Sequence, residues 1–291
     1  MKWKRTGMTL VEILVVLGII ALMVSVLIPA LSVVKNTAKE AKQKAQFNSI
    51  NIALITFKND YGDYPPSDCP PVVGDYTGAQ KLAEALVGWD LLGFHPKSAW
   101  RSDGLDSNGG NTTYDPQRTR DIDGDGVPDT LKERKEPYLD IEVANAFKLG
   151  DVSGLNTGLF DNASVAASGL APNTYVLCDV YNMKKVVLPD GSRVTAGAPI
   201  LYYKANTSQK LITNIYQARD NDPLVMLKEA ASGIEQPLGR ANNNYEFFYN
   251  YIHNPKIESI LQPYRPDSYI LISAGPDGIY GTSDDVRNFG N

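Results

Sequence analysis

The sequence predicts an α+β protein in which a long N-terminal α-helix packs on a C-terminal globular domain built around an antiparallel β-sheet. Three observations support this prediction: an apolar run near the N-terminus, a helix-periodic stretch after it, and β-branched and aromatic segments in the C-terminal half. We expect a leader at residues 1–7, a helix at residues 8–60 and a globular domain at residues 61–291. A loop-rich insertion occupies roughly residues 101–172 of that domain.

The apolar run covers residues 13–31 and is interrupted only by Gly18, Ser25 and Pro29. About 20 apolar residues in a helix cross the hydrocarbon core of a bilayer, so the run predicts one membrane-spanning helix. The leader before it carries three cations and no acid. Because Lys and Arg favour the cytoplasmic side, we expect the N-terminus inside and the bulk of the chain outside.

The helix is expected to continue beyond the apolar run as an amphipathic helix. Apolar side chains recur at spacings of three to five while lysines occupy the opposite side. The pattern ends at residues 60–63, and Pro65-Pro66 cannot continue a helix. Residues 78–88 show the same spacing and predict a second, short helix. The apolar positions of the long helix are Ala38, Ala41, Ala45, Ile50, Leu54 and Phe57.

Strand signals gather in the C-terminal half. Residues 174–181, 185–188 and 199–203 are rich in β-branched and aromatic residues, and residues 269–273 supply a last apolar strand. A turn at residues 189–191, with the sequence Pro-Asp-Gly, separates two of these segments. Residues 246–253 fit either a strand or a helix, and residues 139–172 are read as loops with one short helix.

Charge and motif content exclude several function classes. The net charge is −5, and removal of the three leader cations changes it to −8, which argues against nucleic acid as a partner. His95 and His253 are the only histidines. The sequence contains no nucleophile elbow, Walker loop or His-Glu-x-x-His motif, so we expect no enzymatic activity.

The two cysteines, Cys69 and Cys178, permit two readings. An outward-facing domain would allow them to form a disulfide. Their spacing matches no zinc signature, and isolated cysteines also serve as small buried hydrophobic residues. Both readings stay open at this point.

Glu12 is the most informative residue, because it is an acid at the start of the apolar run. A carboxylate among hydrocarbon costs free energy, so such a residue usually has a cationic partner and a function. The alternative is an anchored protein whose glutamate lies at the depth of the lipid headgroups.

Residues 7–12, with the sequence Gly-Met-Thr-Leu-Val-Glu, together with the apolar run, resemble the prepilin leader junction of type IV pilins and type II secretion pseudopilins. The resemblance implies that a prepilin peptidase cuts the Gly7-Met8 bond and methylates the Met8 amine. Glu12 then pairs with that amine in a neighbouring subunit. Pro29 also fits the pilin pattern, in which a proline lets the filament helix stretch; the alternative is an ordinary helix kink.

The acidic loop at residues 121–129 is expected to bind calcium. Asp121, Asp123, Asp125 and Asp129 hold relative positions 1, 3, 5 and 9, with glycine at position 6, an arrangement that wraps oxygens around a hard cation. The loop resembles those of thrombospondin-type and dockerin-type repeats. It departs from the EF-hand pattern because position 12 is a lysine and the closing acid, Glu133, comes one residue later. A solvated turn is the alternative.

A second acidic loop, at residues 274–286, follows the last predicted strand. It is similar to the C-terminal calcium loop of major pseudopilins. That resemblance makes Asp277, with Asp284 or Asp285, the candidate ligands of a structural calcium ion. Here too, a solvated turn without metal is the alternative.

These features together predict a structural subunit of a pseudopilus that drives protein export by type II secretion. The resemblance implies a homo-oligomeric filament, and its partners are prepilin peptidase, other pseudopilins and the inner-membrane secretion platform. We expect a single-pass inner-membrane protein with a periplasmic domain that is extracted into the filament. Two alternatives remain: a type IV pilus subunit for adhesion or motility, and a surface binding module anchored by a pilin signal.

Overall fold

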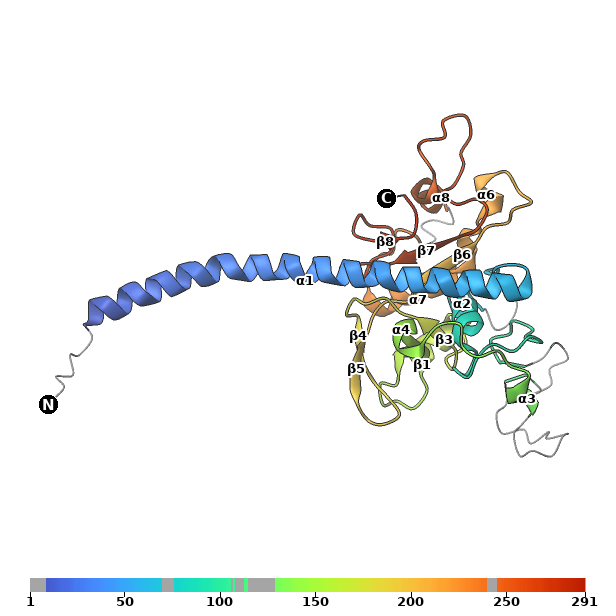
Figure 1. The fold of residues 1–291 in the computed structure, drawn as a ribbon, viewed down its shortest axis with the longest axis horizontal. Helices are drawn as coiled ribbons and strands as arrows, with labels where there is room; N and C mark the ends of the chain where they lie inside the picture. The colour runs from blue at the N-terminus through green and yellow to red at the C-terminus, as the bar shows by residue number, and fades with distance from the viewer. Residues whose placement is uncertain are drawn as a thin grey trace. The chain divides into compact units, whose positions relative to one another are not determined.

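Figure 1 presents the protein as a computed structural model that describes residues 9–69, 76–105, 107, 113–114, 129–239 and 245–290. Two compact units make up the chain, Met1–Ala41 and Lys42–Asn291, and the division falls inside one long helix. The expected mixed α+β class, with a long N-terminal helix and antiparallel sheets in the C-terminal part, is confirmed.

The long helix α1 spans Leu10–Tyr61, as the sequence predicted for residues 8–60. It ends where the backbone N–H of Gly62 donates to the Lys58 carbonyl at 2.7 Å. Gly62 has a φ of 84°, a left-handed conformation that glycine adopts at little cost. The Pro65-Pro66 pair follows at once.

The expectation of a single-pass inner-membrane protein is corrected. Among the residues that the structure describes, no helix combines the length and the apolarity needed to cross a membrane. The prediction was drawn from the length and the apolar composition of residues 13–31. That run contains Gly18 and Ser25 and passes, within the same helix, into a lysine-rich stretch that begins at Lys35.

The sheet β6-β7-β8 forms the centre of the C-terminal unit, with β6 Leu201–Lys204, β7 Tyr269–Ser273 and β8 Val286–Arg287. β7 pairs antiparallel with both neighbours. All five residues of β7 are buried. A strand covered on both faces reads as a continuous apolar run, which explains why the sequence identified it.

Each face of this sheet has its own core. On one face, Tyr202 and Leu271 pack with Leu54 of α1 and with α2, Gly78–Val87. On the other, Tyr203 and Ile270 pack with α7, Asp222–Ser232, and α8, Glu246–Ile252. The second half of α1 therefore belongs to the globular unit through its apolar side. The predicted buried face is confirmed at Ile50, Leu54 and Phe57, whereas Ala38, Ala41 and Ala45 are exposed.

Two smaller sheets complete the unit. In one, β1 lies between a parallel partner, β2, and an antiparallel partner, β3. In the other, β4 and β5 form a hairpin around the predicted turn at residues 189–191. The bounds are β1 Ala146–Asp151, β2 Gly158–Asp161, β3 Tyr175–Leu177, β4 Lys184–Val187 and β5 Arg193–Ala196. The remaining helices are α3 Asp129–Lys132, α4 Ile141–Ala144, α5 Asn162–Ala167, α6 Ile212–Ile215 and the 3-10 helix η1 Ala218–Asp220.

The strands predicted near residues 174–181, 185–188, 199–203 and 269–273 are confirmed as β3, β4, β6 and β7. The ambiguous segment at residues 246–253 is a helix, α8. The loop prediction for residues 139–172 was wrong, because this stretch contains β1 and β2 as well as α4 and α5. Only alternate residues of β1 reach the core at its start, so its sequence lacks a strong apolar run.

Candidate functional site

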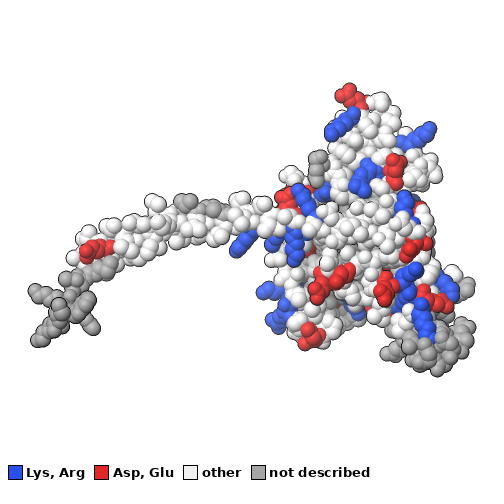
Figure 2. Space-filling model, viewed as in Figure 1, with Lys and Arg blue, Asp and Glu red and all other residues white. Residues whose placement is uncertain are grey.

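The N-terminal unit exposes a large apolar surface along α1. Leu10 is 77% exposed, and the large apolar side chains that follow are exposed as well. Figure 2 shows few charged side chains along this stretch of the helix. We call this set the apolar surface of α1; its members include Val11, Ile13, Leu14, Val15, Val16, Leu17, Ile19, Ile20, Leu22, Met23, Val24, Leu27, Ile28, Leu31, Val33 and Val34.

Glu12 lies in the first turn of α1, next to this surface, and it caps the helix. Its Oε2 accepts hydrogen bonds from the Thr9 backbone N–H at 2.7 Å and from the Thr9 hydroxyl at 2.9 Å. The Thr9 Oγ1 in turn accepts the Glu12 backbone N–H at 3.3 Å. This reciprocal pair is a capping box, a second role for Glu12 that the sequence analysis did not consider.

Of the other predicted site residues near the N-terminus, the structure describes only the position of Pro29. Gly7 and Met8 lie outside the described residues. Pro29 lies within α1, which continues through it as one helix.

The second acidic loop is held by its own aspartates. Asp284 Oδ2 accepts the backbone N–H of Asp277 at 3.0 Å, and Asp277 Oδ1 accepts the N–H of Ile279 at 2.7 Å. Asp285 Oδ2 accepts the Gly281 N–H at 2.8 Å and the Tyr251 hydroxyl. The structure therefore places these three candidate ligands in one loop, where each of them already accepts a backbone N–H of that loop.

Positive φ angles at Gly275, Gly278 and Gly281 allow this tight path. A side chain at Gly275 would bring its Cβ within 2.3 Å of the Asp284 carbonyl oxygen. Tyr280 anchors the loop in the core: its backbone N–H donates to Gln236 Oε1 at 3.0 Å, and its hydroxyl donates to the Pro199 carbonyl.

A lysine from another segment, Lys228, places a positive charge against this loop. Lys228 projects from α7, is 5% exposed, and donates from Nζ to the Gly278 carbonyl. Its ammonium also lies 5.3 Å from the centre of the Tyr280 ring. Burial lowers the pKa of Lys228, whereas the charges of Asp179, Asp277 and Asp285 act in the opposite direction.

The donor set of the second loop does not match a ready calcium site. One oxygen of each of Asp277, Asp284 and Asp285 already accepts a loop N–H. A buried ammonium on the Gly278 carbonyl would also repel a dication placed beside it. Across the part of the chain that the structure describes, no three His, Cys, Asp or Glu side chains are grouped to hold a metal ion.

The structure describes only the end of the first acidic loop. Asp121, Asp123 and Asp125 lie outside the described residues, and Asp129 begins the short helix α3. Glu133, the predicted closing ligand, pairs with Lys97 at 2.7 Å and lies 3.5 Å from His95 Nε2. Calcium in this loop stays a prediction.

The two cysteines are not joined to each other by a disulfide, and both are buried. Cys178 packs in the larger core, where burial raises the pKa of its thiol. These positions favour the reading of buried small hydrophobic residues over a bridge.

Asp179 is a buried acid that the sequence analysis did not single out. Its Oδ1 accepts the backbone N–H groups of Tyr181 at 3.1 Å and Ala198 at 3.0 Å, and its Oδ2 accepts the Ser273 hydroxyl at 2.8 Å. Burial raises its pKa to about 7. An acid inside an otherwise apolar segment, between Cys178 and Val180, was the available signal.

Buried glutamines connect α1 to the segment around β3. Gln46 Nε2 donates to the Val143 carbonyl at 3.1 Å and to the Cys178 carbonyl at 3.0 Å. Gln43 Oε1 accepts the Val180 N–H at 2.9 Å. Their spacing of three residues was visible in the sequence, but glutamines on a helix are usually solvated, so nothing marked them as buried.

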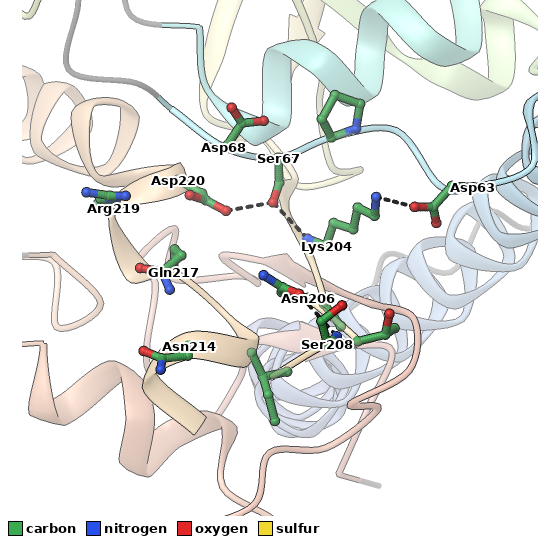
Figure 3. Close-up of a pocket in the computed structure, with 14 residues that line it drawn as sticks. Asp63, Ser67, Asp68, Lys204, Asn206, Ser208, Asn214, Gln217, Arg219 and Asp220 are labelled. Atoms are coloured by element: carbon green, nitrogen blue, oxygen red, sulfur yellow. Dashed lines mark hydrogen bonds and ion pairs between the residues drawn. The ribbon is translucent and has the colours of Figure 1, made fainter. Parts of the chain in front are cut away.

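A polar pocket of about 430 Å³ lies on the C-terminal unit, between the segment after α1 and the segments around β6, α6 and η1. In Figure 3, Ser67 links Asp220 to the β6 backbone, and Lys204 reaches Asp63. The Ser67 hydroxyl donates to Asp220 Oδ2 at 2.6 Å and accepts the Lys204 N–H at 2.9 Å, while the Lys204 ammonium lies 2.6 Å from Asp63. Most charges of this pocket are therefore paired within the protein.

Comparisons with known proteins give no relative. No family model, no curated protein and no solved structure matches the chain.

Proposed function

We propose that the chain is a structural subunit of a homopolymeric filament of the pseudopilin type, in which α1 helices of neighbouring copies cover one another. The observation that carries this proposal is the apolar surface of α1. Its side chains are exposed around the whole helix, and a helix that is apolar on all sides is normally buried. An exposed apolar surface of this extent is typical of an interaction site.

The distribution of charge along α1 supports other copies of this chain as the partners that bury its apolar surface. Between Glu12 and Lys35 the sequence contains no charged residue, so a neighbouring α1 offers a matching apolar partner. Small residues at Gly18 and Ser25 allow close helix approach. Burying Glu12 in such a bundle requires a cation, since an unpaired buried charge costs several kcal/mol.

The resemblance at residues 7–12 indicates that this cation is the amine of Met8, freed by cleavage. Cleavage of the Gly7-Met8 bond by a prepilin peptidase would create an amine at Met8, the residue directly before the Thr9–Glu12 capping box. In the proposed filament, the Met8 amine of one copy meets the Glu12 carboxylate of the next. The acidic loop after β7 favours a pseudopilus of type II secretion over a type IV pilus, and other pseudopilins and the secretion platform are the proposed partners.

Glu12→Gln tests this proposal. Glutamine keeps the capping box, because Gln at this position also reaches back to the backbone, but it removes the charge. We expect the chain, co-expressed with a prepilin peptidase, to begin at Met8 by mass spectrometry and to form filaments by electron microscopy.

The Glu12→Gln variant is expected to be cleaved and to assemble poorly. Normal assembly of this variant would mean that Glu12 only caps its helix. A chain that still begins at Met1 would refute the processing step.

A further inference from the structure

We propose that the ammonium of Lys228 is the built-in cation of the acidic loop at residues 274–286, in the place that the sequence prediction assigned to calcium. This inference is independent of the proposed function. It depends on one side chain and on the oxygen atoms around it.

The contact is the first argument. Lys228 is almost fully buried, and its Nζ donates to the carbonyl oxygen of Gly278, at the centre of the loop. Buried lysines are rare unless they are paired. A backbone carbonyl that points at a cation is also a normal calcium ligand, so the ammonium uses an oxygen that a metal would need.

The surrounding charges are the second argument. Asp179, Asp277 and Asp285 all interact electrostatically with Lys228, and they come from the segment after β3 and from the loop. These acids favour the charged form of the buried ammonium, and the ammonium in turn reduces the repulsion between the acids. This is the task that a calcium ion performs in loops rich in aspartate.

The contact also joins two segments that are far apart in the sequence. Lys228 belongs to α7 and is 50 residues from Gly278 in the sequence. Tyr280 of the same loop packs its ring near the ammonium. Lys228 therefore ties the loop to the helix, whereas a metal ion bound only by loop oxygens would order the loop alone.

Room for an exchangeable cation exists next to the ammonium. A pocket of about 210 Å³ is lined by Lys228 and Asp179 and by residues 275–278 of the loop. Removing the ammonium would expose the Gly278 carbonyl and the nearby carboxylates to this pocket. The structure thus predicts that loss of Lys228 creates a divalent-cation site where the natural chain has none.

Thermal melting of the full-length chain tests the inference, with Lys228→Met as the variant and Lys256→Met, at an exposed lysine, as the matched control. In chelator, we expect Lys228→Met to melt at a lower temperature than the natural chain and the control. Calcium at about 1 mM should raise the melting temperature of Lys228→Met, and adding Asp277→Asn should abolish that gain.

Three outcomes would overturn the inference. Lys228→Met melting like the natural chain in chelator would show that the ammonium does not hold the loop. Absence of any calcium gain in Lys228→Met would make Lys228 an ordinary hydrogen-bond donor. A calcium-dependent rise in the natural chain that Asp277→Asn abolishes would make the loop a metal site. If Asp121→Asn abolishes the calcium response of the natural chain, that response comes from the first loop. The melting comparisons are then repeated in chains that carry Asp121→Asn, and they decide whether Lys228 is the cation of the second loop.

Lysine labelling provides a measurement that needs no variant. In the natural chain, we expect an amine-reactive reagent to modify Lys256 readily and Lys228 slowly, in chelator and in calcium alike. If Lys228 becomes reactive when calcium is added, the metal displaces the ammonium and the inference fails.

Discussion

Asp220→Asn measures the cost of burying a carboxyl group in the wall of the polar pocket. The Asp220 side chain is 3% exposed, and no hydrogen-bond partner for its Oδ1 is found among the described residues. Burial raises the pKa of Asp220 from 3.8 to about 7. The folded state therefore holds the proton more tightly than the unfolded state. The stability that comes from the higher proton affinity of folded Asp220 is fully present below about pH 4 and is lost as the pH rises toward 7.

The size of the effect follows from the two pKa values. Each tenfold difference in proton affinity is worth about 1.4 kcal/mol, so a rise from 3.8 to about 7 corresponds to about 4 kcal/mol. Asparagine keeps an oxygen for the Ser67 hydroxyl and carries no charge. We expect Asp220→Asn to match the natural chain at pH 4 and to be more stable by up to about 4 kcal/mol at pH 8.

Urea unfolding of the full-length chain at both pH values, followed by tryptophan fluorescence, is the assay. Glu235→Gln serves as the control, because its side chain is exposed and loses a charge without any burial. If Asp220→Asn differs from the natural chain by the same free energy at pH 4 and pH 8, or is less stable at pH 8, then the buried carboxylate of Asp220 does not destabilise the folded state.

Two further predictions concern packing of the C-terminal unit. Leu54→Ala, in the core between α1 and the sheet, should cost about 2 to 5 kcal/mol in urea unfolding, and Ile52→Ala, at a side chain 65% exposed, should stay within about 0.5 kcal/mol. Equal costs would mean that this part of α1 is not docked. Gly78→Ala should lower the melting temperature, because the new Cβ would lie 2.2 Å from the Tyr202 carbonyl oxygen, whereas Gly18→Ala meets no atom within 4 Å and should not. A stable Gly78→Ala would contradict the close packing of α2 on β6.

Much of the fold could be predicted because its elements carry local patterns. β7 reads as an apolar run since both its faces are covered, and α1 shows helical spacing up to Phe57. β1 escaped prediction because its residues alternate between core and surface over only a few positions. α8 was ambiguous because aromatic residues suit both strands and helices.

The candidate sites could be predicted only where the sequence neighbours are also the spatial neighbours. The aspartates of the second loop were identified because they lie within nine residues of one another. Lys228 was missed because its partners are in other segments, and Glu12 was seen as an acid but not as a helix cap. The membrane prediction was wrong: among the described residues no helix is long and apolar enough to cross a membrane, and the apolar run that suggested one is part of the longer helix α1.

Cross-linking of assembled subunits tests the central claim that copies of this chain cover the apolar surface of α1. Leu17→Cys places a thiol on that surface, at a side chain 60% exposed, and Lys185→Cys places one on β4 as a control. The native Cys69 and Cys178 are buried and contribute little reaction. We expect covalent dimers for Leu17→Cys and monomers for Lys185→Cys. Monomers alone for Leu17→Cys would contradict the claim.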